Sequence, residues 1–152
     1  MLKICLASDN HGDLDPIHRI LNDNPACDYY FHAGDVMAPP EAIAPFVAVE
    51  GNNDWQFEFP KERIFEIGGH RILLMHGHRY TYSANLMVDK AKENKADIVF
   101  YGHTHVFSDK ILHGIRFINP GSCWHCRDMS GACYARVYLF DDGTIKVERV
   151  DL

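Results

Sequence analysis

The sequence has 152 residues, about the length of one domain, so it predicts a single domain over residues 1–152. Its residues are 47% hydrophobic, 12% aromatic and 24% charged, which is typical of a globular chain and excludes disordered, collagen-like and coiled-coil proteins. The 15 Lys and Arg residues against 21 Asp and Glu residues give a net charge of −6. This charge disfavours nucleic acid as a stable partner and an anionic membrane as a docking surface.

The cysteines and the N-terminal segment predict a cytoplasmic protein. An odd number of cysteines, five, without regular spacing favours reduced thiols over a disulfide framework. Too few apolar residues precede Ser8 for a signal peptide, and no apolar run approaches the roughly 18 residues of a membrane span. Cys123 and Cys126 have the spacing of half a zinc site, but only Cys133 lies nearby, so ordinary reduced thiols are favoured.

Taken in chain order, short apolar runs alternate with helical signals. The runs are rich in Ile, Val, Phe and Tyr and predict buried strands at residues 3–8, 29–33, 46–50, 71–75 and 98–101. Between them, Asp15 is predicted to cap a helix that continues with Pro16. Residues 39–44 predict a short helical turn, and Ser83 is predicted to cap a second helix with an apolar stripe.

The second half adds hairpin signals, with glycine-containing turns at residues 68–69, 113–114 and 141–143. Strands that alternate with helices, followed by hairpins, predict an α/β fold with two facing mixed sheets and helices outside. The alternation of Trp55, Phe57 and Phe59 favours an edge strand. The alternative is that these aromatics, together with Trp124, line the mouth of a site and stack an aryl or base group.

Each apolar run is followed by a cluster of Asp, Asn, His and Gly residues. The clusters are Asp9-Asn10-His11-Gly12, Gly34-Asp35, Gly51-Asn52-Asn53-Asp54, His76-Gly77-His78 and Gly102-His103-Thr104-His105. Ligands of open α/β sheets bind beyond the carboxyl ends of the strands, so the clusters are predicted to meet at one edge. Oxygen and imidazole donors suit Mn, Fe, Zn, Ni or Mg.

Seven residues of these clusters are candidate metal ligands: Asp9, His11, Asp35, Asn52, His76, His103 and His105. This number is too large for one tetrahedral ion and suits two divalent ions, about 3.5–4 Å apart, that share a carboxylate. A single Gly-Asp or Gly-His pair is more often a capping or hydrogen-bonding residue. Five clusters in order, each behind a predicted strand, favour a metal centre.

The ordered motifs D-x-H, G-D, G-N-x-D, H-G-H and G-H-T-H resemble the calcineurin-like metallophosphoesterase family, and Asn119-Pro120-Gly121-Ser122 resembles a motif of its small single-domain phosphodiesterase branch. The resemblance implies an α-β-β-α sandwich. It also implies two divalent ions, with Mn expected and Ni, Fe, Zn or Mg as alternatives. The implied ligands are Asp9, His11, Asp35 and His105 for the first ion, and Asp35, Asn52, His76 and His103 for the second.

The sequence departs from the family pattern at one position. Many family phosphatases have a His directly after the Asn of the G-N motif, where it aids the leaving group, and Asn53 stands there instead. An amide donates no proton at neutral pH. The general-acid contribution to the rate, roughly 10²–10⁴-fold, is therefore absent or comes from another residue. His78 and His32 are candidates for that proton; for His78 a catalytic and a structural role stay equally open, and for His32 a structural role is favoured.

The predicted function is metal-dependent hydrolysis of phosphate esters, diesters more than monoesters, by in-line attack of a hydroxide that bridges the ions. The candidate catalytic residues are Asp35, Asn52, His76 and His78, and the candidate substrate-binding residues are Asn53 and Arg127. The alternative is a protein-interaction scaffold like the retromer subunit that resembles this family, but ligand-type residues at all seven positions favour an enzyme. A small phosphate ester is the expected substrate, and exposed hairpin edges permit a homo-oligomer.

Overall fold

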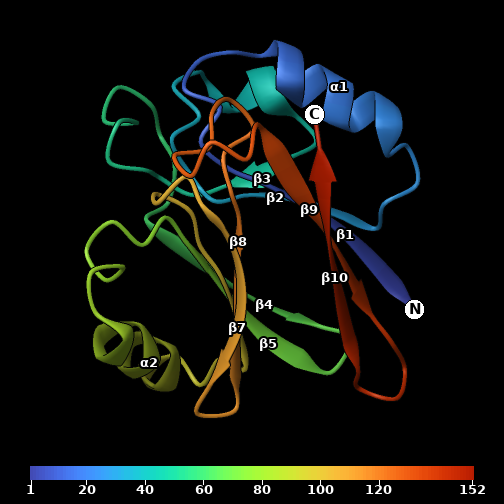
Figure 1. The fold of residues 1–152 in the computed structure, drawn as a ribbon, viewed down its shortest axis with the longest axis vertical. Helices are drawn as coiled ribbons and strands as arrows, with labels where there is room; N and C mark the ends of the chain where they lie inside the picture. Colours follow the sequence, from blue (N-terminus) through green and yellow to red (C-terminus); the bar gives the residue numbers. More distant parts are fainter.

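The computed structural model describes residues 1–152 and contains two mixed five-stranded β-sheets (Figure 1). One sheet has the order β10 (Ile145–Asp151), β9 (Cys133–Leu139), β1 (Leu2–Ala7), β2 (Tyr29–His32) and β3 (Val47–Ala48). The other has the order β4 (Glu62–Ile67), β5 (His70–Met75), β6 (Ile98–Phe100), β8 (Ile115–Pro120) and β7 (Phe107–Leu112). The helices are α1 (Asp15–Asp23), α2 (Ala84–Glu93) and the 3₁₀ helix η1 (Pro40–Ile43), and none of them is long and apolar enough to span a membrane.

Each sheet combines parallel and antiparallel pairing. β1, β2 and β3 run parallel to one another, as do β5, β6 and β8. The hairpins β9–β10, β4–β5 and β7–β8 add antiparallel strands at the edges. The predicted fold class, two facing mixed sheets with helices outside, is therefore confirmed.

Alternation along the strands separates the central core from the helix-facing layers. On β1, Ile4 and Leu6 pack into the cluster between the two sheets, which also holds Phe31, Leu74 and Phe100. The intervening Cys5 and Ala7 pack in the cluster that contains Ile17 and Ile20 of α1. Because successive side chains of a strand point to opposite faces, one strand supplies both layers.

The second sheet repeats this arrangement with α2. Leu73 and Met75 of β5 pack with Met87 and Val88 of α2, whereas Ile72 faces the central cluster. Figure 1 shows α1 and α2 on opposite sides of the molecule, with the two sheets between them. The carboxyl ends of the parallel strands of both sheets are thus left free for the loops of a site.

The helix signals are confirmed with one correction. Ser83 is the N-cap of α2, and its hydroxyl accepts a hydrogen bond from the Leu86 N–H at 3.4 Å. Asp15 does not cap α1: it is the first residue of the helix, and Leu14 occupies the N-cap position. The Asp13 carboxylate accepts from the Asp15 N–H instead, at 3.1 Å, because an aspartate two residues ahead can satisfy that donor.

The prediction of an edge strand over Trp55–Phe59 is wrong. Residues 49–61 contain turns and irregular backbone, and no strand lies between β3 and β4. Phe59 is buried in the α1 layer, while 78% of the Trp55 surface is exposed. The backbone is held in a turn here, because the N–H of Phe57 donates to the Asp54 carbonyl and the Asp54 carboxylate binds backbone amides.

Candidate metal centre

The seven candidate ligands lie in loops that follow strands of both sheets. Asp9 and His11 follow β1, Asp35 follows β2 and Asn52 follows β3, all in the first sheet. From the second sheet, His76 comes directly after β5, and His103 and His105 come after β6. The predicted meeting of these clusters at one edge of the fold is found in the structure.

The backbone is in an unusual conformation at this edge. Five of the seven candidates have a positive φ: Asp9 (57°), His11 (46°), Asp35 (57°), His103 (70°) and His105 (58°). A left-handed conformation at a non-glycine residue costs on the order of 1 kcal/mol or more, and such residues gather at functional sites. Packing and hydrogen bonds of the surrounding loops therefore hold these side chains in place against a local preference.

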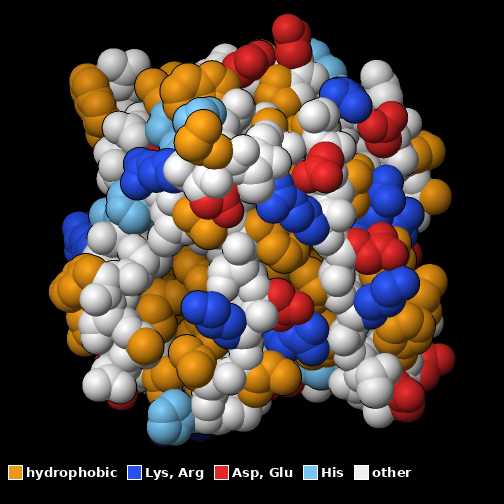
Figure 2. All heavy atoms as spheres, in the orientation of Figure 1, with side chains coloured by type: hydrophobic (Ala, Val, Ile, Leu, Met, Phe, Trp, Pro, Cys, Tyr) orange, Lys and Arg blue, Asp and Glu red, His pale blue; other side chains and the backbone are white.

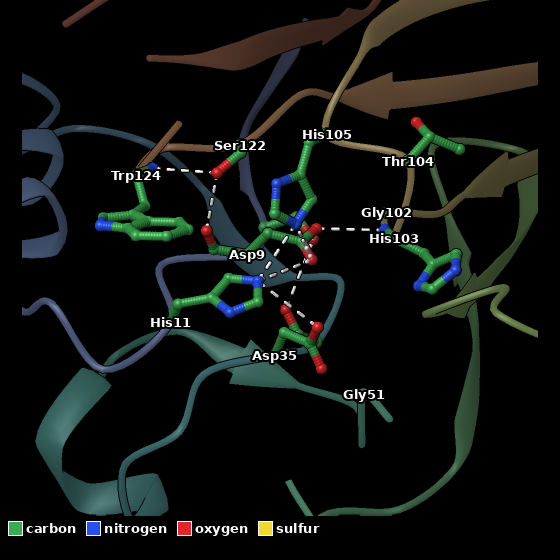
Figure 3. Close-up of polar contacts among 12 residues, drawn as sticks. Asp9, His11, Asp35, Gly51, Gly102, His103, Thr104, His105, Ser122 and Trp124 are labelled. Atoms are coloured by element: carbon green, nitrogen blue, oxygen red, sulfur yellow. Dashed lines mark hydrogen bonds and ion pairs between the residues drawn. The ribbon is translucent and has the colours of Figure 1, made fainter. Parts of the chain in front are cut away.

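One group of candidate ligands consists of Asp9, His11 and His105 (Figure 3). The Nε2 atoms of His11 and His105 are only 3.1 Å apart. Asp9 Oδ1 lies 3.2 Å from Nε2 of His105 and 3.6 Å from Nε2 of His11. Three electron-rich atoms that face one another form a pocket suited to a cation.

A second group consists of Asp9, Asp35 and His76. Asp35 Oδ2 lies 3.4 Å from His76 Nε2 and 3.5 Å from His11 Nε2, so this carboxylate lies between the two groups. Asn52 Oδ1 adds an oxygen 2.9 Å from His76 Nε2 and 3.1 Å from His103 Nδ1. All seven candidates are therefore brought together.

The Asp9 carboxylate is fully buried, and its two oxygens have different surroundings. Oδ2 accepts hydrogen bonds from the Ser8 hydroxyl at 2.5 Å and from the His103 N–H at 3.1 Å. Oδ1 is buried without a hydrogen-bond partner, although it faces the imidazoles. A buried carboxylate oxygen without a donor is costly, and a bound cation would satisfy it.

Charge at the site shifts the pKa values of its groups. Burial alone would raise the pKa of Asp9, but the imidazoles of His105 and His11 beside its Oδ1 outweigh burial and hold the pKa well below its usual range. Burial would lower the pKa of His76, but the adjacent Asp35 and the charge of Asp9 raise it. The nearby Asp9 carboxylate likewise raises the pKa of His11. Two buried carboxylates thus attract positive charge, either protons on the imidazoles or cations.

Hydrogen bonds behind the ligands fix their orientation. The Nδ1–H of His76 donates to the Ala33 carbonyl at 2.7 Å, which leaves the Nε2 lone pair directed at Asp35 and Asn52. Asn53 donates to both oxygens of Asp35, from its backbone N–H at 2.9 Å and its side-chain amide at 2.9 Å. The sequence suggested a substrate contact for Asn53, and in the structure its amide positions the central carboxylate.

Asp54 is a second supporting residue, and it is fully buried. Its carboxylate accepts hydrogen bonds from four backbone N–H groups, those of Asp35, Val36, Met37 and Gly51. The first three belong to the loop after β2 and the last to the loop after β3. One side chain thereby ties together the loops that carry Asp35 and Asn52. The motif marked Asp54 as a loop residue, but no sequence signal indicates all four partners.

Two glycines are required because the loops pass so close to the carboxylates. A Cβ at Gly51 would lie 2.1 Å from Asp35 Oδ1, and a Cβ at Gly102 would lie 2.2 Å from Ser8 Oγ and 2.7 Å from Asp9 Oδ2. Any larger residue would displace these groups. The G-N and G-H motifs therefore have a steric basis.

The Asn-Pro-Gly-Ser segment also supports the site. The Asn119 amide donates to the Gly102 carbonyl at 3.0 Å and to Thr104 Oγ1 at 2.9 Å, which fixes the loop between His103 and His105. The Ser122 hydroxyl donates to the Asp9 carbonyl at 2.8 Å. The roles of Ser8, Asn119 and Ser122 could not be read from spacing, because they depend on contacts between distant segments.

The remaining candidates lie around this cluster. The ring of His78 is 5.6 Å from that of His76, its Nδ1 is buried without a partner, and burial lowers its pKa. His32 is fully buried; its Nε2–H donates to Asn10 and its Nδ1 accepts from the Gly34 N–H, as a structural histidine would. The backbone N–H of Arg127 donates to the His105 carbonyl, but its side chain is exposed and makes no ion pair.

The cysteine segment does not form a third cation site. The Sγ atoms of Cys126 and Cys133 are 3.5 Å apart and buried, and all five cysteines are free thiols. Neither group of candidate metal ligands contains a cysteine. The thiols pack against Gly121, where a Cβ would lie 2.7 Å from Cys133 Sγ, so they fill space beneath the Ser122 turn.

Comparison with known proteins identifies the family. The family model described as a calcineurin-like phosphoesterase superfamily domain matches residues 2–142. The chain belongs to this superfamily. Members of this family use divalent metals, and the two groups of candidate ligands described above fit that chemistry. The resemblance inferred from the ordered motifs is therefore confirmed.

Individual relatives cover most of the chain. The Bacillus subtilis protein named probable metallophosphoesterase YsnB is 30% identical over 146 residues, which cover 93% of this chain and 86% of that protein. Phosphodiesterase YfcE of Escherichia coli strain K12 is 29% identical over 151 residues, with 80% and 79% of the two chains covered. The crystal structure of a Streptococcus pneumoniae TIGR4 protein described as a predicted phosphoesterase has a TM-score of 0.90 and 31% identity, over 99% of this chain and 89% of that one.

A structure of Vps29 from Entamoeba histolytica, complexed with Zn²⁺, shares the fold. Its TM-score is 0.76 at 21% identity, and 99% of each chain is covered. An identity this low shows a common architecture alone. The fold by itself therefore does not decide between catalysis and another role, and the residues of the site carry that distinction.

Proposed function

We propose that this protein is a dinuclear metal-dependent phosphodiesterase. The proposal rests on one observation: seven side chains with oxygen or imidazole donors gather at the buried Asp9, whose Oδ1 has no hydrogen-bond partner. The proposed ligands of one ion are Asp9, His11, Asp35 and His105, and those of the other are Asp35, Asn52, His76 and His103. Manganese is the proposed metal, because mixed carboxylate, amide and imidazole donors suit it.

The chain's own residues prepare this site for phosphate chemistry. Bound there, two divalent cations would supply the charge that neutralises phosphate oxygens and makes water nucleophilic near neutral pH. Ser8 and the His103 N–H hold one oxygen of Asp9 and leave the other free. Asn53 holds Asp35 between the two groups, and the Ala33 carbonyl fixes the tautomer of His76.

The preference for diesters rests on Asn53. Its amide donates to Asp35 and supplies no proton to a leaving group, so the proposed substrates are esters whose leaving group departs readily as an anion. His78 is the remaining candidate for a proton donor. Its ring lies 6.1 Å from that of His103 and lines a cavity of about 270 Å³ beside His76.

The experiment is a metal analysis beside a turnover assay. Purified protein is stripped with a chelator, reloaded with Mn²⁺ and assayed with bis(p-nitrophenyl) phosphate. We expect two ions per chain and hydrolysis, with both lost in D35A and H76A. H18A is the matched control, because His18 is exposed on α1 and outside the cluster. Turnover retained in D35A would refute the site, and two bound ions without hydrolysis of any ester would favour the scaffold role.

A further inference from the structure

The side chain of Trp124 lies half-exposed to solvent beside the candidate metal centre. Half of its surface, 50%, is exposed, although it sits next to a buried cluster. Its ring centroid lies 5.1 Å from that of His11, with a tilt of 30° between the rings. Figure 3 shows the indole at the His11 end of the site, away from His103. His11 thus covers part of the indole and leaves the rest open.

The backbone of Trp124 is anchored to the loops that carry the candidate ligands. The Ser122 hydroxyl, which donates to the Asp9 carbonyl, accepts a hydrogen bond from the Trp124 N–H at 3.1 Å. On either side, the Cys123 N–H donates to the Ser8 carbonyl at 3.1 Å and the Arg127 N–H to the His105 carbonyl at 3.0 Å. The backbone of Trp124 therefore has a defined position relative to Asp9 and His105, and its indole lies against the ring of His11.

The two ends of the site differ in chemistry. Beyond His76 lies the cavity of about 270 Å³, which has a polar lining that includes Glu50, Lys61, Glu62, Arg79 and Lys90. At the other end the half-exposed ring of Trp124 lies beside His11. The space-filling view shows histidines, hydrophobic side chains and a Lys or Arg side chain together at the upper left of this face (Figure 2). A planar ring attached to a phosphate at the metal centre would find its partner at the Trp124 end, since aromatic rings favour offset stacking.

We propose that Trp124 is a stacking platform that selects phosphate esters carrying a nucleobase. This inference rests on the proposed function, because it assumes that phosphate binds between Asp9 and Asp35. Stacking of a base on an aromatic side chain changes binding by roughly five- to a hundredfold. Trp124 therefore determines specificity, and Asp9, Asp35 and the histidines hold the reacting phosphate.

The kinetic test uses two diesters with one leaving group: p-nitrophenyl thymidine 5′-phosphate, which carries a base, and methyl p-nitrophenyl phosphate, which does not. We expect wild type to favour the thymidine ester in kcat/KM. In W124A this preference falls about tenfold through KM, while turnover of the methyl ester and the metal content stay unchanged. W124F keeps most of the preference. The control is W55F, because Trp55 is 78% exposed and stacks on none of the candidate ligands.

Two results would overturn the inference. One is an equal preference in wild type and W124A. The other is a loss in W124A of metal content or of activity on both esters alike, which would mean that the indole only shields His11. Wild type that hydrolyses neither ester contradicts the proposed function instead, and a binding measurement then decides the role of Trp124.

That measurement compares adenosine 5′-monophosphate with ribose 5-phosphate by titration calorimetry on the Mn²⁺-loaded protein. The two ligands share a phosphate and differ by the base, so a stacking platform predicts about tenfold tighter binding of the nucleotide, lost in W124A. Because the chain has two tryptophans, W55F leaves Trp124 as the only one, and its fluorescence should change on addition of the nucleotide. Equal affinity for both ligands would refute the platform.

Discussion

Asp54 should be the residue on which the geometry of the site depends most, although it is not a candidate ligand. Its carboxylate accepts hydrogen bonds from four backbone N–H groups, with N···O distances of 2.7–3.3 Å. The donors are Asp35, Val36, Met37 and Gly51. Oδ2 accepts three of them and Oδ1 accepts that of Met37. In D54N, an amide whose oxygen replaces Oδ2 keeps three acceptor contacts. Its NH₂ group then faces the Met37 N–H, so one hydrogen bond becomes a repulsive contact.

The magnitude follows from these contacts. One lost charge-assisted hydrogen bond costs about 1.5–3 kcal/mol, and the remaining three weaken because the acceptor is now neutral. We therefore expect D54N to lower the free energy of unfolding by about 3 kcal/mol. For a chain of this size that corresponds to a fall in Tm of roughly 6–12 °C. The loops that carry Asp35 and Asn52 should also separate, so Mn²⁺ affinity should fall.

The assay is urea unfolding of chelator-treated wild type and D54N, followed by a Mn²⁺ titration of both. The control is D142N, because Asp142 also accepts a backbone N–H, from Thr144 at 2.9 Å, but is fully exposed in the β9–β10 turn. D142N should unfold at the same urea concentration as wild type. A D54N protein as stable as D142N, with unchanged Mn²⁺ affinity, would refute the reasoning.

Three further predictions concern sterics, pH and metal. In G102A the new Cβ would lie 2.2 Å from Ser8 Oγ and 2.7 Å from Asp9 Oδ2, so the protein should lose its bound metal. The control is G114A, where a Cβ has no neighbour within 4 Å and metal binding should be unchanged. Burial lowers the pKa of His32 to about 4 from an ordinary value of about 6.5. The unfolded chain therefore binds more protons between these values, and the free energy of unfolding falls by about 3 kcal/mol as the pH drops from 6.5 to 4. Denaturation of H32Q at pH 7 and pH 5 should show a shallower fall than wild type, and an equal slope would contradict this. Finally, Mn²⁺ at a hundred times its Kd should add about 2.7 kcal/mol of stability, measured as a rise in Tm that H18A retains and H76A loses.

The sequence predicts the ligand cluster because the order of the strands along the chain determines where the residues that follow them lie. Each candidate ligand follows an apolar run, and parallel strands end at a common edge, so order along the chain becomes proximity in space. This is why Asp35 and His76, 41 positions apart in the sequence, could be predicted to lie at one edge, whereas their assignment to one ion followed from the family resemblance.

What the sequence could not predict are contacts that depend on side-chain direction. Trp55, Phe57 and Phe59 have the period of a strand, yet the Phe57 N–H donates to the Asp54 carbonyl and the Gly51 N–H to the Asp54 carboxylate, so a turn forms. A period-2 pattern measures only how side chains alternate, and it carries no information about a buried acceptor. Helix α1 likewise begins one residue earlier than predicted, because the Asp13 carboxylate, outside the helix, accepts the hydrogen bond of the Asp15 N–H.

The conformational strain and the buried charge at this edge point to one conclusion. Five left-handed non-glycine residues and an unpaired oxygen of Asp9 each raise the free energy of the folded chain. A surface that served only to dock a partner would not need either feature, because protein interfaces use apolar and hydrogen-bonded groups. A bound cation would explain both features. The left-handed backbone turns Asp9, His11 and His105 towards one point, and a positive charge there would remove the free-energy cost of burying an unpaired carboxylate oxygen. These features support the proposal that the site binds cations.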